Sequence, residues 1–202
     1  REYKTTVQVI NILEALEATG VSKIAEKVKH GLSGKRVACY YGCLLLRPPR
    51  VTGAKKFENP DTMERVIKAL GGEPIMWGRK TTCCGAGLSI SKTASVLRLI
   101  DEILEDAKSA GAELIAVACP MCMTNLDLRQ LGLIRRGRNA LPIFYITELI
   151  GIAMGIDPKE LGIKKHYISA EAVLKDIKER GEAKLPEAPS KEIEDLEASE
   201  EL

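Results

Sequence analysis

The sequence predicts an α/β fold: a mostly parallel sheet with crossover helices and cysteine-bearing loops at the carboxyl ends of the strands. Three observations predict it. Short apolar runs alternate with amphipathic helical stretches along the 202 residues. Helices of this length between strands favour right-handed crossovers, and hence parallel strands. Cysteines directly follow several of the apolar runs, at the sheet edge where ligands of such folds gather.

In the first half of the chain, the spacing of apolar residues and the positions of glycines predict the helices and strands. Residues 5–30 carry apolar side chains at helical spacing interrupted at Gly20, which predicts two helices joined by a turn. The β-prone run 36–41 predicts a buried strand that ends in a loop. A helical stripe over residues 60–70, stopped by two glycines, is followed by a strand expected over residues 73–77.

The same alternation continues in the second half of the chain. Each apolar run there is short, and each helical stretch has one apolar face. We expect a helix over 88–110, a strand over 114–118, a helix over 123–130, a strand over 142–146 and a helix over 147–154.

Composition fits one globular domain, or a domain with a tail, since 45% of the residues are hydrophobic and 29% are charged. No apolar run approaches the roughly 18 to 20 residues of a membrane span, and no signal-peptide pattern is present. We therefore expect a cytoplasmic protein. Because the first residue is Arg1 rather than Met, we also expect the chain to begin inside a longer gene product.

Charge is distributed unevenly along the chain. Residues 171–202 hold eleven acidic and five basic side chains, a composition typical of a flexible or partner-docking extension. The basic residues of the body are scattered and not interleaved with aromatics, which argues against nucleic-acid binding. We expect an N-terminal helical segment (1–34), a cysteine-rich domain (35–165) and an acidic helical or flexible tail (166–202).

Five of the six cysteines follow the pattern Cys-X39-Cys-Cys-Gly-X33-Cys-X2-Cys; they are Cys43, Cys83, Cys84, Cys119 and Cys122. A Cys-X2-Cys pair suits metal capture. Adjacent cysteines are hard to explain by packing, and Gly85 would let the backbone turn so that both thiolates face one centre. Five ligands exceed the four that a zinc ion or a cubane 4Fe-4S cluster needs. A cluster of opened or doubled geometry could use all five, whereas buried small hydrophobes are the alternative interpretation.

These cysteines closely resemble a known family. Cys43, Cys83-Cys84-Gly85 and Cys119-Pro120-Met121-Cys122 resemble the cysteine-rich CCG domain. With the stretch from Tyr40 to Pro49 they resemble the B subunit of heterodisulfide reductases, over roughly residues 5–155. The family implies two such domains per chain, and this chain resembles the C-terminal half. The second CCG domain would then lie upstream or on another chain.

The resemblance implies a cofactor, a reaction and partners. All five patterned cysteines would bind a noncubane 4Fe-4S cluster, and a disulfide would be cleaved reductively with electrons from a flavin-containing A-like subunit through an iron–sulfur C-like subunit. Cys39 lies outside the motif and inside a strand, so we expect a buried core residue. Leu44 stands where methanogen enzymes of the family have a histidine, which puts their particular heterodisulfide in doubt as the substrate.

Other polar residues have more than one interpretation. Arg47 and Arg50 could bind a sulfonate, phosphate or carboxylate of the substrate, or could simply be solvated on an exposed loop. Hydroxyl and backbone donors of Lys80, Thr81 and Thr82 could tune a cluster through hydrogen bonds to sulfur. His30 and His166 are expected to be surface or capping residues, so no catalytic residue is assigned.

Three functions remain open from the sequence. The first is the catalytic subunit of a heterodisulfide-reductase-like complex. The second is a noncatalytic module in which the cysteines bind zinc or an electron-relay cluster. The third is a CCG-type iron–sulfur oxidoreductase for another substrate, such as one of a lactate, glycolate or succinate/quinone system.

Overall fold

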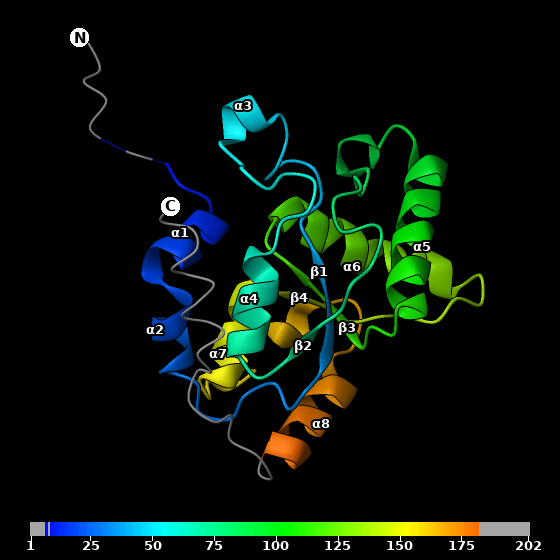
Figure 1. Cartoon of the computed structure of the whole chain (residues 1–202). Coiled ribbons are helices and arrows are strands. Elements are labelled where there is room, and N and C mark those ends of the chain that lie inside the picture. Colours follow the sequence, from blue (N-terminus) through cyan, green and yellow to red (C-terminus); the bar gives the residue numbers. More distant parts are fainter. Residues whose placement is uncertain (1–6, 8, 182–202) are drawn as a thin grey trace.

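The computed structural model describes residue 7 and residues 9–181 (Figure 1). Its sheet contains β1 (Arg36–Tyr40), β2 (Glu73–Pro74), β3 (Leu114–Val117) and β4 (Ile143–Tyr145). All neighbouring pairs are parallel, in the order β2-β1-β3-β4. The predicted α/β class with a parallel sheet is confirmed, and each expected strand is present.

Helices cover both faces of this sheet (Figure 1). They are α1 (Ile12–Thr19), α2 (Val21–Ala25), α3 (Pro49–Thr52), α4 (Thr62–Ala69), α5 (Thr93–Ser109), α6 (Pro120–Ile134), α7 (Ile146–Ala153) and α8 (Glu171–Gly181), with 3-10 turns η1 (Ala86–Leu88) and η2 (Ile163–Lys165). One core packs α1, α2, α4, α7 and α8 against the sheet. The other packs α5 and α6 against its opposite face.

Alternation along β1 assigns side chains to these two cores. Val37 and Cys39 belong to the core beneath α4 and α7, whereas Ala38 and Tyr40 belong to the core beneath α5 and α6. This is the period of two expected for a strand that is buried on both faces. Cys39 and Tyr40 therefore face opposite sides of the sheet.

Local signals account for the first two helices. Asn11 Oδ1 accepts hydrogen bonds from the N–H groups of Leu13 and Glu14, and the Glu14 carboxylate accepts from Asn11 N. This reciprocal capping starts α1. Gly20, at φ +85°, ends α1 and precedes α2, which confirms the predicted break at that residue.

Strand β2 is shorter than the expected range 73–77. Ile75 N still donates to Val37 O at 3.0 Å, but beyond it the indole N–H of Trp77 donates to the Cys39 carbonyl at 3.1 Å. A side-chain donor thus satisfies a carbonyl of β1, and the chain leaves the sheet there.

The first residues of α5 and α6 also differ from the prediction. Helix α5 begins at Thr93 because residues 86–88 form a separate 3-10 turn. Helix α6 begins at Pro120, with Cys119 at its N-cap, since proline is well accommodated in the first helical turn. The expectation of cysteine-bearing loops is therefore wrong for Cys122, which lies in the first turn of α6.

Within the described part of the acidic tail, residues 171–181 form helix α8, which packs against the body. Val173 and Ile177 of α8 are 8% and 3% exposed. The buried ammonium of Lys35 pairs with Glu113 at 2.9 Å and also with Asp176 of α8. The rest of the tail, 182–202, lies outside the described residues. Within the described ranges, none of the helices combines the length and the apolar character needed to cross a membrane.

Candidate cysteine site

The carboxyl edge of the sheet brings all the patterned cysteines into one region. Cys84 Sγ lies 3.7 Å from Cys122 Sγ, and Cys119 is close enough to Cys122 to raise the pKa of its thiol. Burial raises the pKa of the Cys43 thiol, and the neighbouring Cys83 raises it further. The sulfurs therefore form two neighbouring groups, one of three cysteines and one of two.

Tyr40 links the two groups of thiols. Burial is the main cause that raises the pKa of its phenol, and the nearby thiolate charges of four cysteines raise it further; these are Cys122, Cys84, Cys83 and Cys43. The Tyr40 hydroxyl donates to the Thr82 carbonyl at 2.5 Å. The ring therefore lies among the sulfurs, and its hydroxyl holds the residue that precedes Cys83.

Solvent reaches the cysteines from one side of the site only, the side of Cys43 and Cys83. Cys84, Cys119 and Cys122 are 3%, 5% and 4% exposed, whereas Cys43 is partly buried and Cys83 is exposed. A ligand held by all five would thus be anchored in the core through three cysteines. It would face solvent on the side of Cys43 and Cys83.

Two of the buried cysteines favour the thiolate form. The hydrogen bond from Cys122 lowers the pKa of Cys84 to about 6, and burial opposes this only in part. The Cys119 pKa is likewise lowered to about 6, mainly by its hydrogen bond to Cys122. The pKa of Cys122 is raised well above its ordinary value, since its proton is shared by both neighbours. Thiolate is the form of cysteine that binds metals.

Gly42 gives the backbone close access to the buried sulfurs. Its φ is +66°, and a Cβ there would lie 2.9 Å from Cys122 Sγ and 3.4 Å from Tyr40 Cε1. A glycine is therefore required by both conformation and contact. The close approach of the Gly42 backbone to Cys122 and the soft thiolate donor set both fit an inorganic sulfur-ligated group. No three His, Cys, Asp or Glu side chains of the described residues meet the geometry of a single-ion site.

The loops that carry Cys43 and Cys83 are joined by Lys80. Its carbonyl accepts from Tyr41 N at 2.8 Å and from Gly42 N at 3.1 Å. Its buried ammonium donates to Pro60 O at 2.6 Å and to the Glu64 carboxylate at 3.0 Å. The side chain and the carbonyl of Lys80 therefore connect the two cysteine-bearing loops to α4.

Glu64 completes this network, and a backbone N–H donates a hydrogen bond to one of the sulfurs. Glu64 also accepts from the Tyr41 hydroxyl at 2.5 Å, and that hydroxyl accepts from Met63 N at 2.8 Å. The N–H of Gly85 donates to Cys83 Sγ at 3.3 Å. The hydrogen bond to sulfur thus comes from the residue that follows the cysteine pair.

Cys39 is separate from this set, as expected. It is fully buried in the core on the other face of the sheet, and burial raises the pKa of its thiol. Its assignment as a core residue is confirmed.

The remaining sequence candidates lie around the site or away from it. Arg47 and Arg50 are exposed at and just before α3, which projects from the carboxyl edge of the sheet (Figure 1). Leu44 is 63% exposed beside Cys43. His30 is exposed, and His166 is the C-cap residue of η2, as one of the two expected alternatives, but its side chain is not at the surface. Its side chain is 8% exposed and lies 2.9 Å from the Glu148 carboxylate.

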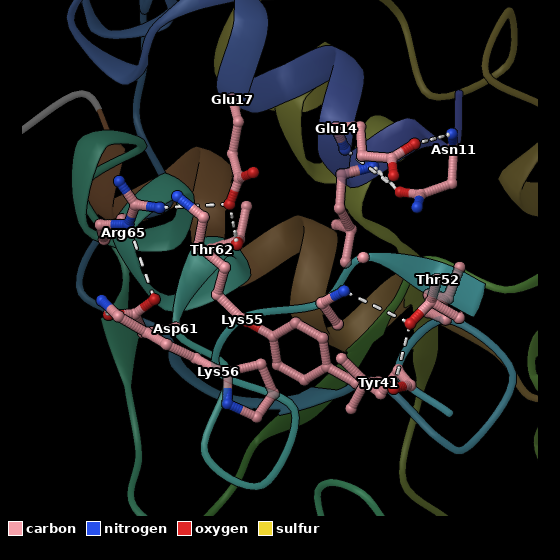
Figure 2. Close-up of a pocket in the computed structure, with 16 residues that line it drawn as sticks. Asn11, Glu14, Glu17, Tyr41, Thr52, Lys55, Lys56, Asp61, Thr62 and Arg65 are labelled. Carbon is pink, nitrogen blue, oxygen red and sulfur yellow. Dashed lines mark hydrogen bonds and ion pairs between the residues drawn. The ribbon is translucent and has the colours of Figure 1, made fainter. Parts of the chain in front are cut away.

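A cavity of about 490 Å³ lies between α1, α4 and the segment after Cys43, but no cysteine lines it (Figure 2). Several of its polar groups already satisfy one another. Thr62 donates to the Glu17 carboxylate at 2.5 Å, and Lys56 pairs with Asp61 at 3.0 Å. We assign the chemistry to the cysteines because the reactive groups converge there.

Residues that sequence reasoning missed lie on α6 and the loop facing it. Asn125 is 5% exposed and donates to the Cys84 carbonyl at 2.7 Å, and Arg129 donates to the carbonyl of Ser89 at 2.8 Å. Both follow Cys122 at helical spacing, at positions three and seven residues on. The spacing places both residues on the same helix face as Cys122, but it does not show which loop that face contacts.

Comparison with known proteins is consistent with this site. Residues 37–127 match the family model of the cysteine-rich domain CCG. The chain is 32% identical, over 83% of its length, to the 8-methylmenaquinol:fumarate reductase membrane anchor subunit of Wolinella succinogenes. It is 31% identical, over 83% of its length, to the B subunit of the ferredoxin/F420H2-dependent CoB-CoM heterodisulfide reductase of Methanosarcina acetivorans. A protein of Archaeoglobus profundus, named for its likeness to the B subunit of heterodisulfide reductase, is 30% identical over 70% of the chain.

The match covers only part of each relative. The chain spans 60% of the Wolinella protein, 57% of the Methanosarcina protein and 50% of the Archaeoglobus protein. A crystal structure of a hypothetical protein from Helicobacter pylori matches with a TM-score of 0.61 and 14% identity, over 82% of this chain and 30% of that one. That likeness shows the fold.

Proposed function

The chain belongs to the CCG cysteine-rich family, with relatives among the B subunits of heterodisulfide reductases, and from this premise we propose that it is the catalytic iron–sulfur subunit of a heterodisulfide-reductase-like complex. The observation that carries the proposal is the convergence of five cysteines from three distant segments on one edge of the sheet. Cysteines packed as small hydrophobes would have no reason to converge from three segments on one edge of the sheet.

The proposed cofactor is a noncubane 4Fe-4S cluster bound by Cys43, Cys83, Cys84, Cys119 and Cys122. When bound, a cluster of this kind supplies one-electron transfer and a soft Lewis acid for sulfur. The chain's part is to offer thiolates at Cys84 and Cys119 and to exclude water from three of the five ligands. Zinc is the alternative cofactor, although no three of the described thiols meet the geometry of a single-ion site.

The substrate would approach on the solvent side of the site. Cys83 is exposed there, beside the partly exposed Cys43. Arg47 and Arg50 present charged groups just beyond, and we propose that they attract an anionic group of the disulfide. The exposed Leu44 offers an apolar contact and no proton.

A second candidate is favoured by one relative. The protein from Wolinella succinogenes, named as a subunit of a methylmenaquinol:fumarate reductase, raises the hypothesis that this domain passes electrons from another donor such as a quinol. The same five cysteines would hold the cluster, but no disulfide would be reduced.

Both relatives are named as subunits of larger enzymes, and we propose that this chain also acts in an assembly. The expected partners are a flavin-containing A-like subunit, an iron–sulfur C-like subunit and a second CCG domain. A cytoplasmic location remains a prediction.

Metal analysis of the anaerobically purified chain tests the proposal. We expect about four irons and four sulfides per chain, together with visible absorption. One zinc with no visible absorption would reject the cluster. Reduction of a disulfide by the loaded complex, with reduced viologen as donor, separates the first candidate from the second, for which oxidation of a quinol is the corresponding assay.

A further inference from the structure

One face of α6 is bound at three successive positions to the loop that follows Cys84. Cys122 Sγ contacts Cys84 Sγ at 3.7 Å. One turn later, Asn125 Nδ2 donates to the Cys84 carbonyl at 2.7 Å. Another turn on, Arg129 Nη2 donates to the Ser89 carbonyl at 2.8 Å. The loop from Cys84 to Ser89 is therefore aligned along a stripe of this helix.

Asn125 is the central contact of that stripe. Its side chain is enclosed between helix and loop at 5% exposure, and its oxygen accepts from the Ser89 hydroxyl at 2.8 Å. That bond orients the amide so that its NH₂ group faces the Cys84 carbonyl. A buried amide with both ends satisfied holds a single rotamer.

We propose that Asn125 is a positioning residue that sets the separation of Cys84 and Cys122, and through it the affinity and electronic structure of the group these cysteines bind. The argument is geometric. Asn125 lies on the same helix as Cys122 and donates a hydrogen bond to the carbonyl of Cys84. A change at this amide therefore moves one sulfur relative to the other. The effect on the bound cluster rests on the proposed function, whereas the effect on the two thiols does not.

Helix α6 contains a matched control. Gln130 is also a buried amide, 1% exposed, and bonds the backbone of Leu141 twice, from Leu141 N at 2.8 Å and to Leu141 O at 2.9 Å. It is eight residues from Cys122, and its partner lies in the segment before β4. Asn125→Leu and Gln130→Leu each remove a buried amide from the same helix, but only the first removes a contact with a cysteine.

The first measurement uses the metal-free chain and needs no cofactor. Wild type and both variants are treated anaerobically with diamide, which oxidises a thiol pair to a disulfide and is itself reduced to the hydrazine. Peptide mapping then follows formation of the Cys84–Cys122 disulfide. We expect Asn125→Leu to slow it at least fivefold and Gln130→Leu to leave it within twofold of wild type, with the melting temperature lowered in both. Equal rates in wild type and Asn125→Leu would overturn the proposal.

The second measurement uses the reconstituted chain. We expect Asn125→Leu to hold less than half of the wild-type iron, or to show a changed electron paramagnetic resonance spectrum, while Gln130→Leu matches wild type. If wild type binds no iron, the proposed function fails, but the diamide comparison still decides the role of Asn125. Should Asn125→Leu not fold, Ser89→Ala removes only the orienting hydroxyl. It is expected to slow formation of the disulfide two- to threefold, and a wild-type rate would reject the positioning role.

Discussion

The main-chain N–H of Tyr41 donates to the carbonyl of Lys80 at 2.8 Å. This bond joins the segment that ends at Cys43 to the segment that leads into Cys83. The same lysine pairs its buried ammonium with Glu64, which is in turn bound to the Tyr41 hydroxyl. One residue thus fixes two cysteine-bearing loops through its backbone and the helix α4 through its side chain.

Lys80→Met should destabilise the fold by about 3 kcal/mol, because it leaves the Glu64 carboxylate buried without its cation. The Lys80 and Glu64 side chains are 11% and 14% exposed. Urea unfolding of the metal-free chain measures the change. Lys175→Met is the control, since it breaks an ion pair whose side chains are 75% and 64% exposed and should cost less than about 1 kcal/mol. Similar losses in both variants would contradict the importance of the buried pair.

Cys84→Ser should abolish most iron binding, whereas Cys39→Ser should keep it. Cys84 contacts Cys122 at 3.7 Å, and Cys39 is enclosed in the core on the other face of the sheet. The cost of Cys39→Ser is one of packing and of a buried hydroxyl, about 1 to 3 kcal/mol. Iron content and urea unfolding are measured on the same samples. Equal loss of iron from both variants would mean that Cys39 is a ligand.

Gly42→Ala should weaken cofactor binding more than Gly53→Ala does. Both glycines have positive φ, +66° and +70°, but a Cβ at Gly42 would meet Cys122 Sγ at 2.9 Å while one at Gly53 meets nothing within 4 Å. Both variants bear a backbone strain of about 1 to 2 kcal/mol, so the pair isolates the contact with sulfur. Release of iron to a chelator is the measurement, and we expect at least a fivefold faster rate for Gly42→Ala alone. Matching rates would show that the close approach is unimportant.

The His166–Glu148 pair should make the stability of the fold depend on pH. Burial opposes the charged ring, yet the hydrogen bond and charge of Glu148, with Asp127 nearby, raise the pKa of His166 above its ordinary value. The unfolded chain has the lower pKa, about 6.5, so the contribution is complete below that pH and is lost as pH rises through the folded-state pKa. The unfolding free energy of wild type minus that of His166→Gln should therefore fall on going from acidic to alkaline pH. A difference that grows with pH would have the wrong sign.

Local patterns were sufficient for much of the architecture. The alternation of apolar runs and amphipathic stretches identified the strands, because the periodicity of a segment depends only on the sequence of that segment. The break at Gly20 was predictable for the same reason. The length of β2 was not, because Trp77 reaches Cys39 from 38 residues away, and no local signal contains that contact.

By itself the sequence determined the α/β class, the positions of the strands and the cysteine set, because periodicity and spacing are properties of the chain. Tertiary structure alone decided which cysteines touch, that Cys122 begins a helix and that Asn125 grips a loop 41 residues away. It also paired Lys80 with Glu64 and buried the His166 side chain against Glu148. These outcomes depend on how helices pack across the sheet, and hydrogen bonds between distant segments form only once that packing brings their donors and acceptors together.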